Sequence, residues 1–300
     1  MNVMPHWMLI SDGLIQAGSE LSLHPVLLPW QEEMIKRKRA WFSCKDKMPL
    51  EWYAAIVDAP PAVLLATQCG DIPVDTKQCW VASPYSSQLG RDTVRVMSEG
   101  SVPWREDDAR WLCDMLNPLL GEEKMHLLNI GAALLLACCE PMAVRPESFA
   151  MVAGKVLPNH HPEGADGGRL MRLISEIQMS LHGIYADHRA GKADIHGLWF
   201  WGGSLWPAKR PETMPAVATR NPFLQAVVEG KDAKMMMTEA ERIDELVKQG
   251  TSLPEKIVLA GEGNAVLLTK ALLPRLGKAG WIPKSARDEP ELLSELRRFI

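Results

Sequence analysis

The sequence predicts an α/β protein in which a mixed sheet is flanked by helices. Two patterns along the 300 residues indicate this class. Short strand-like segments follow one another in the first half, as in an antiparallel arrangement, whereas strand-like and helix-like segments alternate in the second half, as in a parallel one. A composition of 47% hydrophobic and 23% charged residues is that of an ordinary globular protein.

We expect a single composite domain that spans residues 1–300. A chain of this length can fill one large α/β domain or two domains of ordinary size. No linker stands out between the strand-rich half, residues 1–155, and the half of helices and strands, residues 156–300. The lack of such a linker favours the single domain.

The first half begins with a predicted strand at residues 7–10. Asp12 follows it closely, at an edge where α/β folds often place an active site. Residues 27–41 are expected to be helical, which makes the basic run at 36–39 the solvated end of a helix. Apolar or alternating runs then predict three short strands, at residues 62–67, 79–83 and 93–97.

A helix is expected over residues 105–120, because three acidic residues crowd its first turn and apolar residues recur on one face. Pro118 would end this helix a turn early, and otherwise Gly121 would end it. Residues 125–129 and 133–138 then predict a hairpin.

The second half contains the best helix pattern of the chain, over residues 166–188, where apolar residues form one continuous stripe. A short buried strand follows at residues 198–201, and Gly202 and Gly203 end it in a turn. Further elements are predicted at residues 239–249 (helix), 257–259 (strand), 265–273 (helix) and 290–299 (helix).

Charge and composition exclude several classes of protein. A formal charge of −4 argues against a nucleic-acid-binding protein, which usually carries a basic surface. Neither a signal peptide nor an apolar run long enough to span a membrane is visible. The six cysteines form no C-x-x-C pair and no disulfide framework, so we expect a cytoplasmic protein without a membrane partner.

The most informative segment is the tryptophan-rich stretch from Gly197 to Pro207. A strand that ends in a glycine turn is where α/β proteins often place a binding site. The preceding helix and loop carry polar side chains that could line a pocket beneath the tryptophans. We therefore expect the ligand-binding residues to be Glu176, Gln178, His182, Arg189, His196, Trp199, Trp201, Gly202 and Gly203.

The alternative is structural: Gln178 and His182, four residues apart on one helix face, would tie the helix to its neighbouring loops. No other motif assigns a chemistry. Adjacent His160 and His161 rarely point at one ion, so we expect no metal site there. The glycine turn at 261–264 lacks a phosphate-binding pattern, and no G-x-S-x-G elbow is present. No catalytic residue is assigned.

The segments from Ser175 to His182 and from Leu198 to Gly203 resemble a poorly characterised proteobacterial family of RpfE-type regulatory proteins. Some members of that family are described as cofactor-independent phosphoglycerate mutases. The tryptophan motif is also similar to the W-L-W-G-x-G of archaeal-type phosphoglycerate mutases. The resemblance implies a diverged scaffold of the alkaline-phosphatase superfamily.

The chain departs from the family pattern at several positions. Ser175 and His196 replace asparagines, and Ser204 replaces a third glycine. The metal cluster on which a phosphoglycerate mutase depends has no counterpart that we identify in the sequence. The family's residues are kept at Glu176, Gln178, Met179, His182, Trp199, Trp201, Gly202, Gly203 and Pro207.

Three functions are compatible with these observations. The first is a regulatory or small-molecule-binding protein without metal-dependent catalysis or a cofactor, which binds a small metabolite or a protein partner near Trp199 and Trp201. The second is a phosphotransferase similar to phosphoglycerate mutase or to a phosphatase, in which Asp12 and histidines such as His182 and His196 surround a divalent metal. The third is a structural interaction module with the tryptophans in its core. The first is preferred.

Overall fold

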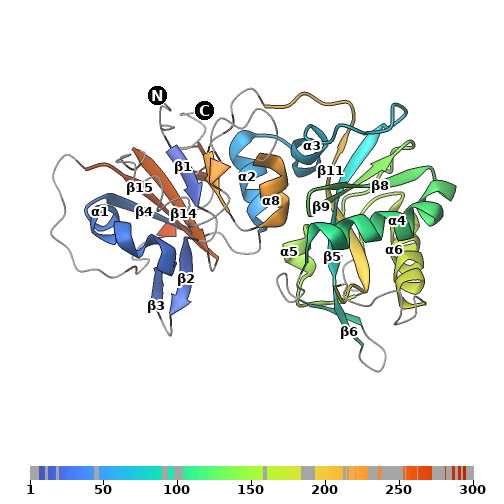
Figure 1. Cartoon of the computed structure of the whole chain (residues 1–300), viewed down its shortest axis with the longest axis horizontal. Helices are drawn as coiled ribbons and strands as arrows, with labels where there is room; N and C mark the ends of the chain where they lie inside the picture. The colour runs from blue at the N-terminus through green and yellow to red at the C-terminus, as the bar shows by residue number, and fades with distance from the viewer. Residues whose placement is uncertain are drawn as a thin grey trace. The chain divides into compact units, whose positions relative to one another are not determined.

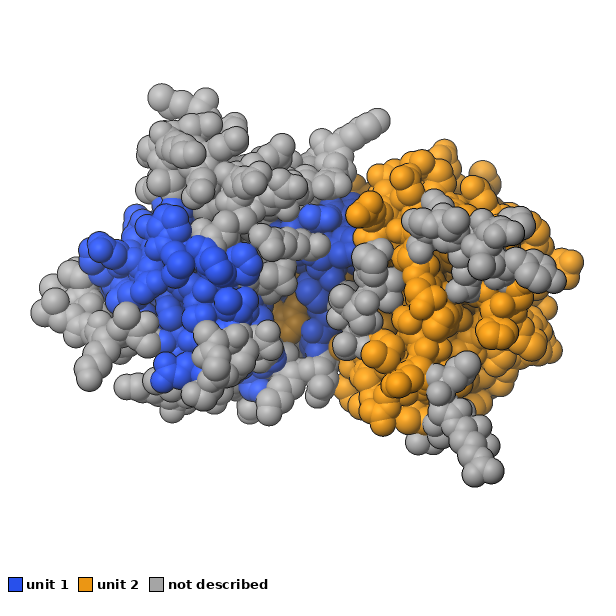
Figure 2. Space-filling model, turned by 60° about the horizontal axis from the view of Figure 1, so that its bottom comes forward, with its two compact units in different colours: residues 1–49, 55–58, 211–300 blue, residues 50–54, 59–210 orange. Residues whose placement is uncertain are grey.

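The chain forms two compact units in the computed structural model. Unit 1 comprises residues 1–49, 55–58 and 211–300, and unit 2 comprises residues 50–54 and 59–210 (Figure 2). The structure describes residues 7–10, 13–17, 20–43, 47–89, 94–97, 104–157, 161–183, 193–211, 214, 216–219, 221–228, 236–237, 253, 255–261, 263–271, 281, 286–287, 290–291 and 293–294. Compactness does not decide whether the units fold separately, so the single composite domain stays a prediction.

Unit 1 is built on a seven-stranded mixed sheet with the strand order β13-β12-β1-β14-β15-β4-β16 (Figure 1). Strand β1 is parallel to β12 and β14, whereas β15 is antiparallel to β14 and β4. The predicted mixed sheet is thereby confirmed. The strands are β1 (Trp7–Ile10), β4 (Lys38–Ser43), β12 (Ala216–Ala218), β13 (Met236–Met237), β14 (Lys256–Gly261), β15 (Asn264–Thr269) and β16 (Ala286–Arg287).

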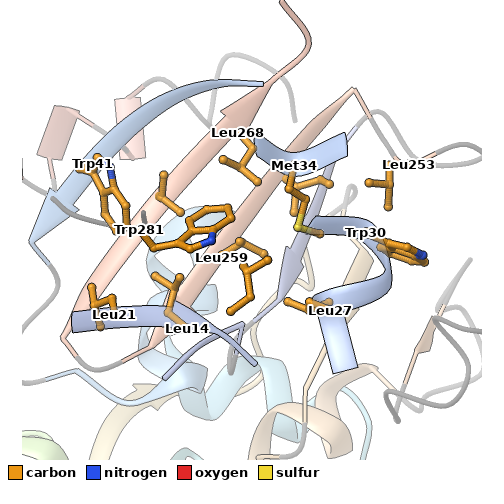
Figure 3. Packing of buried hydrophobic residues seen from close by; sticks show 13 residues of the cluster. Leu14, Leu21, Leu27, Trp30, Met34, Trp41, Leu253, Leu259, Leu268 and Trp281 are labelled. Atoms are coloured by element: carbon orange, nitrogen blue, oxygen red, sulfur yellow. The ribbon is translucent and has the colours of Figure 1, made fainter. Parts of the chain in front are cut away.

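One face of this sheet packs on the segment that follows β1. The hairpin of β2 (Leu14–Ala17) and β3 (Glu20–Leu23), the 3-10 helix η1 (Pro25–Trp30) and the helix α1 (Gln31–Ile35) supply Leu14, Leu27 and Met34 to a buried cluster with Leu259 and Leu268 of the sheet (Figure 3). Alternate residues of β14 and β15 point into this cluster, as the two-residue period of a strand requires.

The helix expected over residues 27–41 is wrong in its second half. Helix α1 ends at Ile35, and β4 begins at Lys38, because its backbone pairs with β15 and β16. The basic run is a solvated helix end only at Lys36, the exposed residue that follows α1. Arg37 is buried, and its guanidinium donates to Glu33 (2.8 Å) and to the carbonyl oxygen of Glu255 (3.2 Å).

The helix expected over residues 265–273 is a strand over its first part. Gly261 and Gly263 have φ angles of 154° and 67°, and they close a hairpin in which β14 and β15 pair from Gly261 and Asn264 onward. Strand β15 is buried on both faces, so its apolar run has no alternation to separate it from a helix. No helix start follows the glycine turn that could attract an anion.

Unit 2 contains a four-stranded antiparallel sheet in the order β11-β5-β9-β8 and a smaller sheet in the order β10-β7-β6 (Figure 1). The predicted hairpin and the strands near residues 79 and 93 are confirmed. The strands are β5 (Gln78–Tyr85), β6 (Ser87–Leu89), β7 (Val94–Val96), β8 (Met125–Ile130), β9 (Ala133–Cys138), β10 (Val156–Leu157) and β11 (Gly197–Leu205).

Helices flank the larger sheet of unit 2. Helix α4 (Glu106–Glu122) packs against β8, and α6 (Gly167–His182) packs against β11. Both helices were predicted, and α4 continues through Pro118 and includes Gly121. Further helices among the described residues are α2 (Pro49–Val57), α3 (Pro61–Ala66), α5 (Phe149–Val152) and α8 (Pro222–Val228).

The strand expected over residues 62–67 is wrong, because α3 occupies this segment. Pro61 stands in the first turn, where a missing N–H costs nothing, and Ala62 to Ala66 are all buried. A short, fully buried apolar run fits a helix or a strand equally well.

Several predictions fall outside the described residues. These are the helix at 239–249, the end of the 166–188 helix after Gly183, and most of the helix at 290–299, of which residues 290–291 and 293–294 are helical. Among the described helices, none has the length and the apolar character needed to cross a membrane.

Candidate functional site

The paired glycines of the tryptophan motif form a β-bulge in β11, which continues to Leu205, so the strand end and turn expected at Gly202 and Gly203 are wrong. Trp201 pairs with Val81 and Ser204 with Cys79, so β11 carries one more residue than β5 between these pairs. Gly202 has a φ of 60°, which side chains rarely tolerate, and a Cβ on Gly203 would overlap the ring of Trp80. Packing and backbone conformation therefore explain both glycines.

Trp199 and Trp201 lie in the core of unit 2. Both side chains are fully buried. The Trp199 Nε1–H donates to the carbonyl oxygen of Glu147 at 2.9 Å, and the Trp201 Nε1–H donates to Ser83 Oγ at 2.8 Å. Both indole N–H groups therefore have their hydrogen-bond acceptors within the protein. Ligand binding by Trp199 and Trp201 stays a prediction.

Tyr85, at the end of β5, lies beside the start of β11. Tyr85 pairs with Gly197, and its carbonyl oxygen accepts the His196 N–H at 2.8 Å. The phenol ring lies so close to Gly197 that a Cβ there would overlap Cζ and the hydroxyl. Gly197 thus gives Tyr85 the space to lie across the start of β11.

The hydroxyl of Tyr85 is buried without a well-formed hydrogen bond to any residue that the structure describes. Gln178 of α6 comes near this hydroxyl. Burial raises the pKa of the Tyr85 phenol far above its ordinary value, and the nearby Gln178 amide opposes this rise only in part. The phenol is therefore neutral, with a proton to donate.

His196 connects the start of β11 to the start of β6. The Ser87 N–H donates to His196 Nδ1 at 2.9 Å, and Ser87 Oγ lies 3.1 Å from the same nitrogen. On the other side of the ring, Nε2 lies 3.1 Å from Asp194 Oδ1. The carbonyl oxygen of Ser87 also lies 2.9 Å from Nδ1. We assign the proton of the neutral ring to Nε2, because the Asp194 carboxylate faces that nitrogen and the Ser87 N–H points at Nδ1.

The segment that carries Asp194 and His196 is anchored to the first turn of α4. Asp108 is buried, and its two carboxylate oxygens accept the N–H of Ala193 and the N–H of Arg105, each at 2.9 Å. This pair of bonds fixes the backbone just before Asp194, so the imidazole has a defined position.

The structure brings together only part of the predicted site. Two of the predicted residues contact Tyr85 at different atoms: Gln178 lies near its hydroxyl, and the backbone N–H of His196 bonds to its carbonyl oxygen. Glu176 instead faces Arg172 (3.6 Å), and His182 is exposed at the end of α6. Arg189 lies outside the described residues. The predicted site as a whole stays untested.

Tyr85, Ser87 and Asp194 were not among the residues predicted from the sequence. Asp194 had a usable signal, because two polar residues at positions i and i+2 share a face when the chain is extended, and His196 is the second of them. Tyr85 and Ser87 had none, since they reach His196 only through the pairing of β5 and β11, and Ser87 lies 109 positions from His196 along the chain.

A metal centre does not emerge from the residues that are described. Within those ranges, no group of three or more His, Cys, Asp or Glu side chains is arranged to hold an ion. Asp12 and His160 lie outside them, and His161 Nδ1 lies 3.1 Å from the carbonyl oxygen of Pro162.

No family model and no curated protein matches the sequence. Two solved structures are similar to this chain. Cofactor-independent phosphoglycerate mutase from Thermoplasma acidophilum DSM 1728 is 12% identical, with a TM-score of 0.35, over 99% of this chain and 100% of that one. The PH0037 protein from Pyrococcus horikoshii is 11% identical, with a TM-score of 0.45, over 99% of each chain.

This likeness concerns the fold, a mixed α/β arrangement similar to that of the mutase, and we transfer no residue role from it. The RpfE-type family is not among these similarities, and membership in it stays a prediction.

Proposed function

We propose that this chain is a small-molecule-binding protein, with a regulatory role, whose site is the polar cluster of Tyr85, Ser87, Gln178, Asp194 and His196. The observation that carries the proposal is the Tyr85 hydroxyl, which is buried without a well-formed partner among the described residues. Buried polar groups nearly always have a hydrogen-bond partner, and leaving one without costs about 1–3 kcal/mol. A bound molecule with an acceptor oxygen would remove that cost.

The chemistry of the cluster favours an uncharged ligand with hydroxyl or carbonyl groups. Tyr85 and Gln178 are neutral hydrogen-bonding groups, and Asp194 brings a negative charge next to His196. An anionic group at this place would meet that carboxylate. The ligand we expect is therefore a small hydroxy or carbonyl compound.

The test is a titration of the full chain with glycerol, dihydroxyacetone, ethyl acetate, inorganic phosphate and 3-phosphoglycerate, followed by Tm and tryptophan emission. A ligand at a hundred times its Kd stabilises the folded state by about 2.7 kcal/mol, which is a measurable rise in Tm. We expect the rise with at least one of the three uncharged compounds. A panel without any rise would mean that the hydroxyl is satisfied by water, and would overturn the proposal.

Tyr85→Phe makes the titration specific to the site. The variant keeps the ring that packs on Gly197 and removes only the hydroxyl, so we expect a folded protein of equal or higher Tm that has lost the response to the ligand. Tyr53→Phe, at a second buried tyrosine of unit 2, is the matched control and should keep the response. A Tyr85→Phe protein that responds like the parent would contradict the proposed site.

The alternative is the phosphotransferase that the tryptophan motif and the name of one similar structure suggest. We derive no metal-dependent step for this chain, because the described residues offer no cluster that would hold the ion. The alternative is tested by incubating the protein with Mn²⁺ and 3-phosphoglycerate. Turnover to 2-phosphoglycerate would replace the binding proposal with the mutase one.

A further inference from the structure

We propose that Ser87, His196 and Asp194 form a proton relay through which Ser87 attacks the carbonyl carbon of a small carboxylic ester. The inference rests on the proposed binding site and adds an activity to it. It starts from two distances, 3.1 Å from Ser87 Oγ to His196 Nδ1 and 3.1 Å from His196 Nε2 to Asp194 Oδ1. A hydroxyl, an imidazole and a carboxylate therefore stand in hydrogen-bond reach, in that order.

The tautomer assigned to the ring suits a general base. Nδ1 faces the Ser87 N–H and hydroxyl and carries the lone pair, while the Nε2 proton faces Asp194. To activate a nucleophile, the base must turn a lone pair toward the nucleophile and its N–H toward the group that orients it. Either ring nitrogen can serve as the base.

The surroundings also stabilise the ring once it has taken the Ser87 proton. The carbonyl oxygen of Ser87 lies 2.9 Å from Nδ1 and would accept the new N–H, while Asp194 balances the positive charge from the other side. The relay therefore has a partner for each of the two states that the ring passes through.

The relay is held in place and open to solvent. Asp108 anchors the backbone next to Asp194, and the His196 N–H is bound to the carbonyl oxygen of Tyr85. The imidazole is 33% exposed and the Asp194 side chain 73% exposed, so a small ester can reach the ring and the half-buried Ser87. Rigid placement of the base beside the nucleophile is what such a step requires.

The reaction balances with an ester and water alone. Ser87 Oγ forms a bond to the carbonyl carbon while its proton moves to Nδ1, and the bond to the alcohol oxygen breaks as that oxygen takes the proton. Water then gives a proton to Nδ1 as its oxygen attacks the acyl carbon. The Ser87–acyl bond breaks, and Ser87 Oγ recovers the proton from Nδ1 as the acid leaves. Ser87 and His196 are the catalytic residues, and Asp194 is a positioning residue.

The experiment uses the full chain with p-nitrophenyl acetate and, separately, a fluorophosphonate that labels nucleophilic serines. We expect the protein to hydrolyse p-nitrophenyl acetate. We also expect the fluorophosphonate label on Ser87 in the mass spectrum. Ser87→Ala should abolish the label and lower kcat/KM at least about a hundredfold, the lower end of what a positioned base contributes. Ser86→Ala, one residue away, is the matched control and should keep both.

Two further variants separate the parts of the relay. His196→Gln should lose the activity as Ser87→Ala does. Asp194→Asn should lower kcat and leave KM unchanged, because Asp194 orients the ring without touching the ester, and Asp194→Glu should restore part of kcat. Circular dichroism and Tm confirm that each variant is folded. A label on another serine, or hydrolysis unchanged in Ser87→Ala, would overturn the relay.

The outcomes also distinguish this inference from the proposed function. A ligand-induced Tm rise that persists in Ser87→Ala, with no ester hydrolysis in the parent protein, would leave the binding site standing and remove the relay. Labelling of Ser87 without any Tm rise from the uncharged compounds would support the relay and remove the proposed binding of those compounds.

Discussion

In the tryptophan motif of unit 2, close packing explains the residue types better than polarity does. Glycines at the start and in the bulge of β11 let the rings of Tyr85 and Trp80 lie directly on the backbone. Both tryptophans of the motif have their N–H groups bonded inside the core. The composition of the motif therefore follows first from the pairing of β11 with β5 and from the side chains that pack there.

Gly203→Ala tests this explanation of the bulge. The added Cβ would overlap the Trp80 ring, and overpacking of a core costs about 1–3 kcal/mol of the free energy of unfolding. Gly168→Ala is the matched control, because nothing lies within 4 Å of a Cβ there and the helix α6 should gain about 0.5–1 kcal/mol. Urea unfolding measures both. A neutral Gly203→Ala would contradict the close packing.

The buried thiols give a second prediction at this scale. Burial raises the pKa of Cys79, Cys113 and Cys138 to about 12, so at pH 8 almost none of each is the reactive thiolate. We expect iodoacetamide to leave all three unlabelled in the native protein and to label them in urea, as peptide mass spectrometry would show. Native labelling as fast as in urea at any of them would be inconsistent with the burial.

At the scale of elements, side chains complete strands and helix ends that the backbone leaves open. Strand β8 lies at the edge of its sheet, and Asn117 of α4 bonds there to both backbone groups of Leu127 (2.8 and 3.0 Å). Asp108 does the same for the start of α4 and for the segment before β11. The Asn117 contacts protect the edge of β8, which could otherwise pair with another chain.

Asn117→Ala removes both bonds to β8. At about 0.5–1.5 kcal/mol for each hydrogen bond, we expect unfolding to become easier by about 1–3 kcal/mol. The uncovered edge should also raise light scattering during heating. Asn129→Ala, at a half-buried asparagine of the same strand whose amide reaches only the carbonyl oxygen of Gly131 at 3.5 Å, should change neither. If Asn117→Ala and Asn129→Ala behave alike, Asn117 does not protect the edge.

Asp108→Ala tests the anchor beneath the candidate site. The change leaves the N–H groups of Ala193 and Arg105 without their acceptor, at a cost of about 1–3 kcal/mol for each buried group that finds no substitute. Hydrogen exchange should become faster in the peptide around residues 193–196. Asp107→Ala removes a neighbouring first-turn charge that is exposed, and should leave this exchange unchanged.

At the scale of the whole molecule, the chain divides in a way that its order does not suggest. The middle of the chain forms unit 2, and both ends contribute to unit 1, where β1 lies between β12 and β14. Unit 2 has its own sheets, flanking helices and buried residues. A single composite domain and two cooperating units therefore differ in a property that can be measured, which is whether unit 2 folds without the rest of the chain.

A protein of residues 50–210 should fold without the rest of the chain. We expect a cooperative thermal transition and near-ultraviolet circular dichroism of packed tryptophans, because Trp199 and Trp201 have all their cited partners inside unit 2. A broad, non-cooperative transition would instead support the single composite domain over residues 1–300.

The sequence by itself determined the α/β class, the two long helices of unit 2, the hairpin that lies between them in the chain and the location of the tryptophan strand, because long periodic patterns depend on local spacing. It also pointed to Gln178 and His196. Only the tertiary structure decided that the runs at 62–67 and 265–269 are a helix and a strand, since burial on all sides erases periodicity. Only pairing between distant strands brought Tyr85 and Ser87 to His196, and no local pattern records such a pairing.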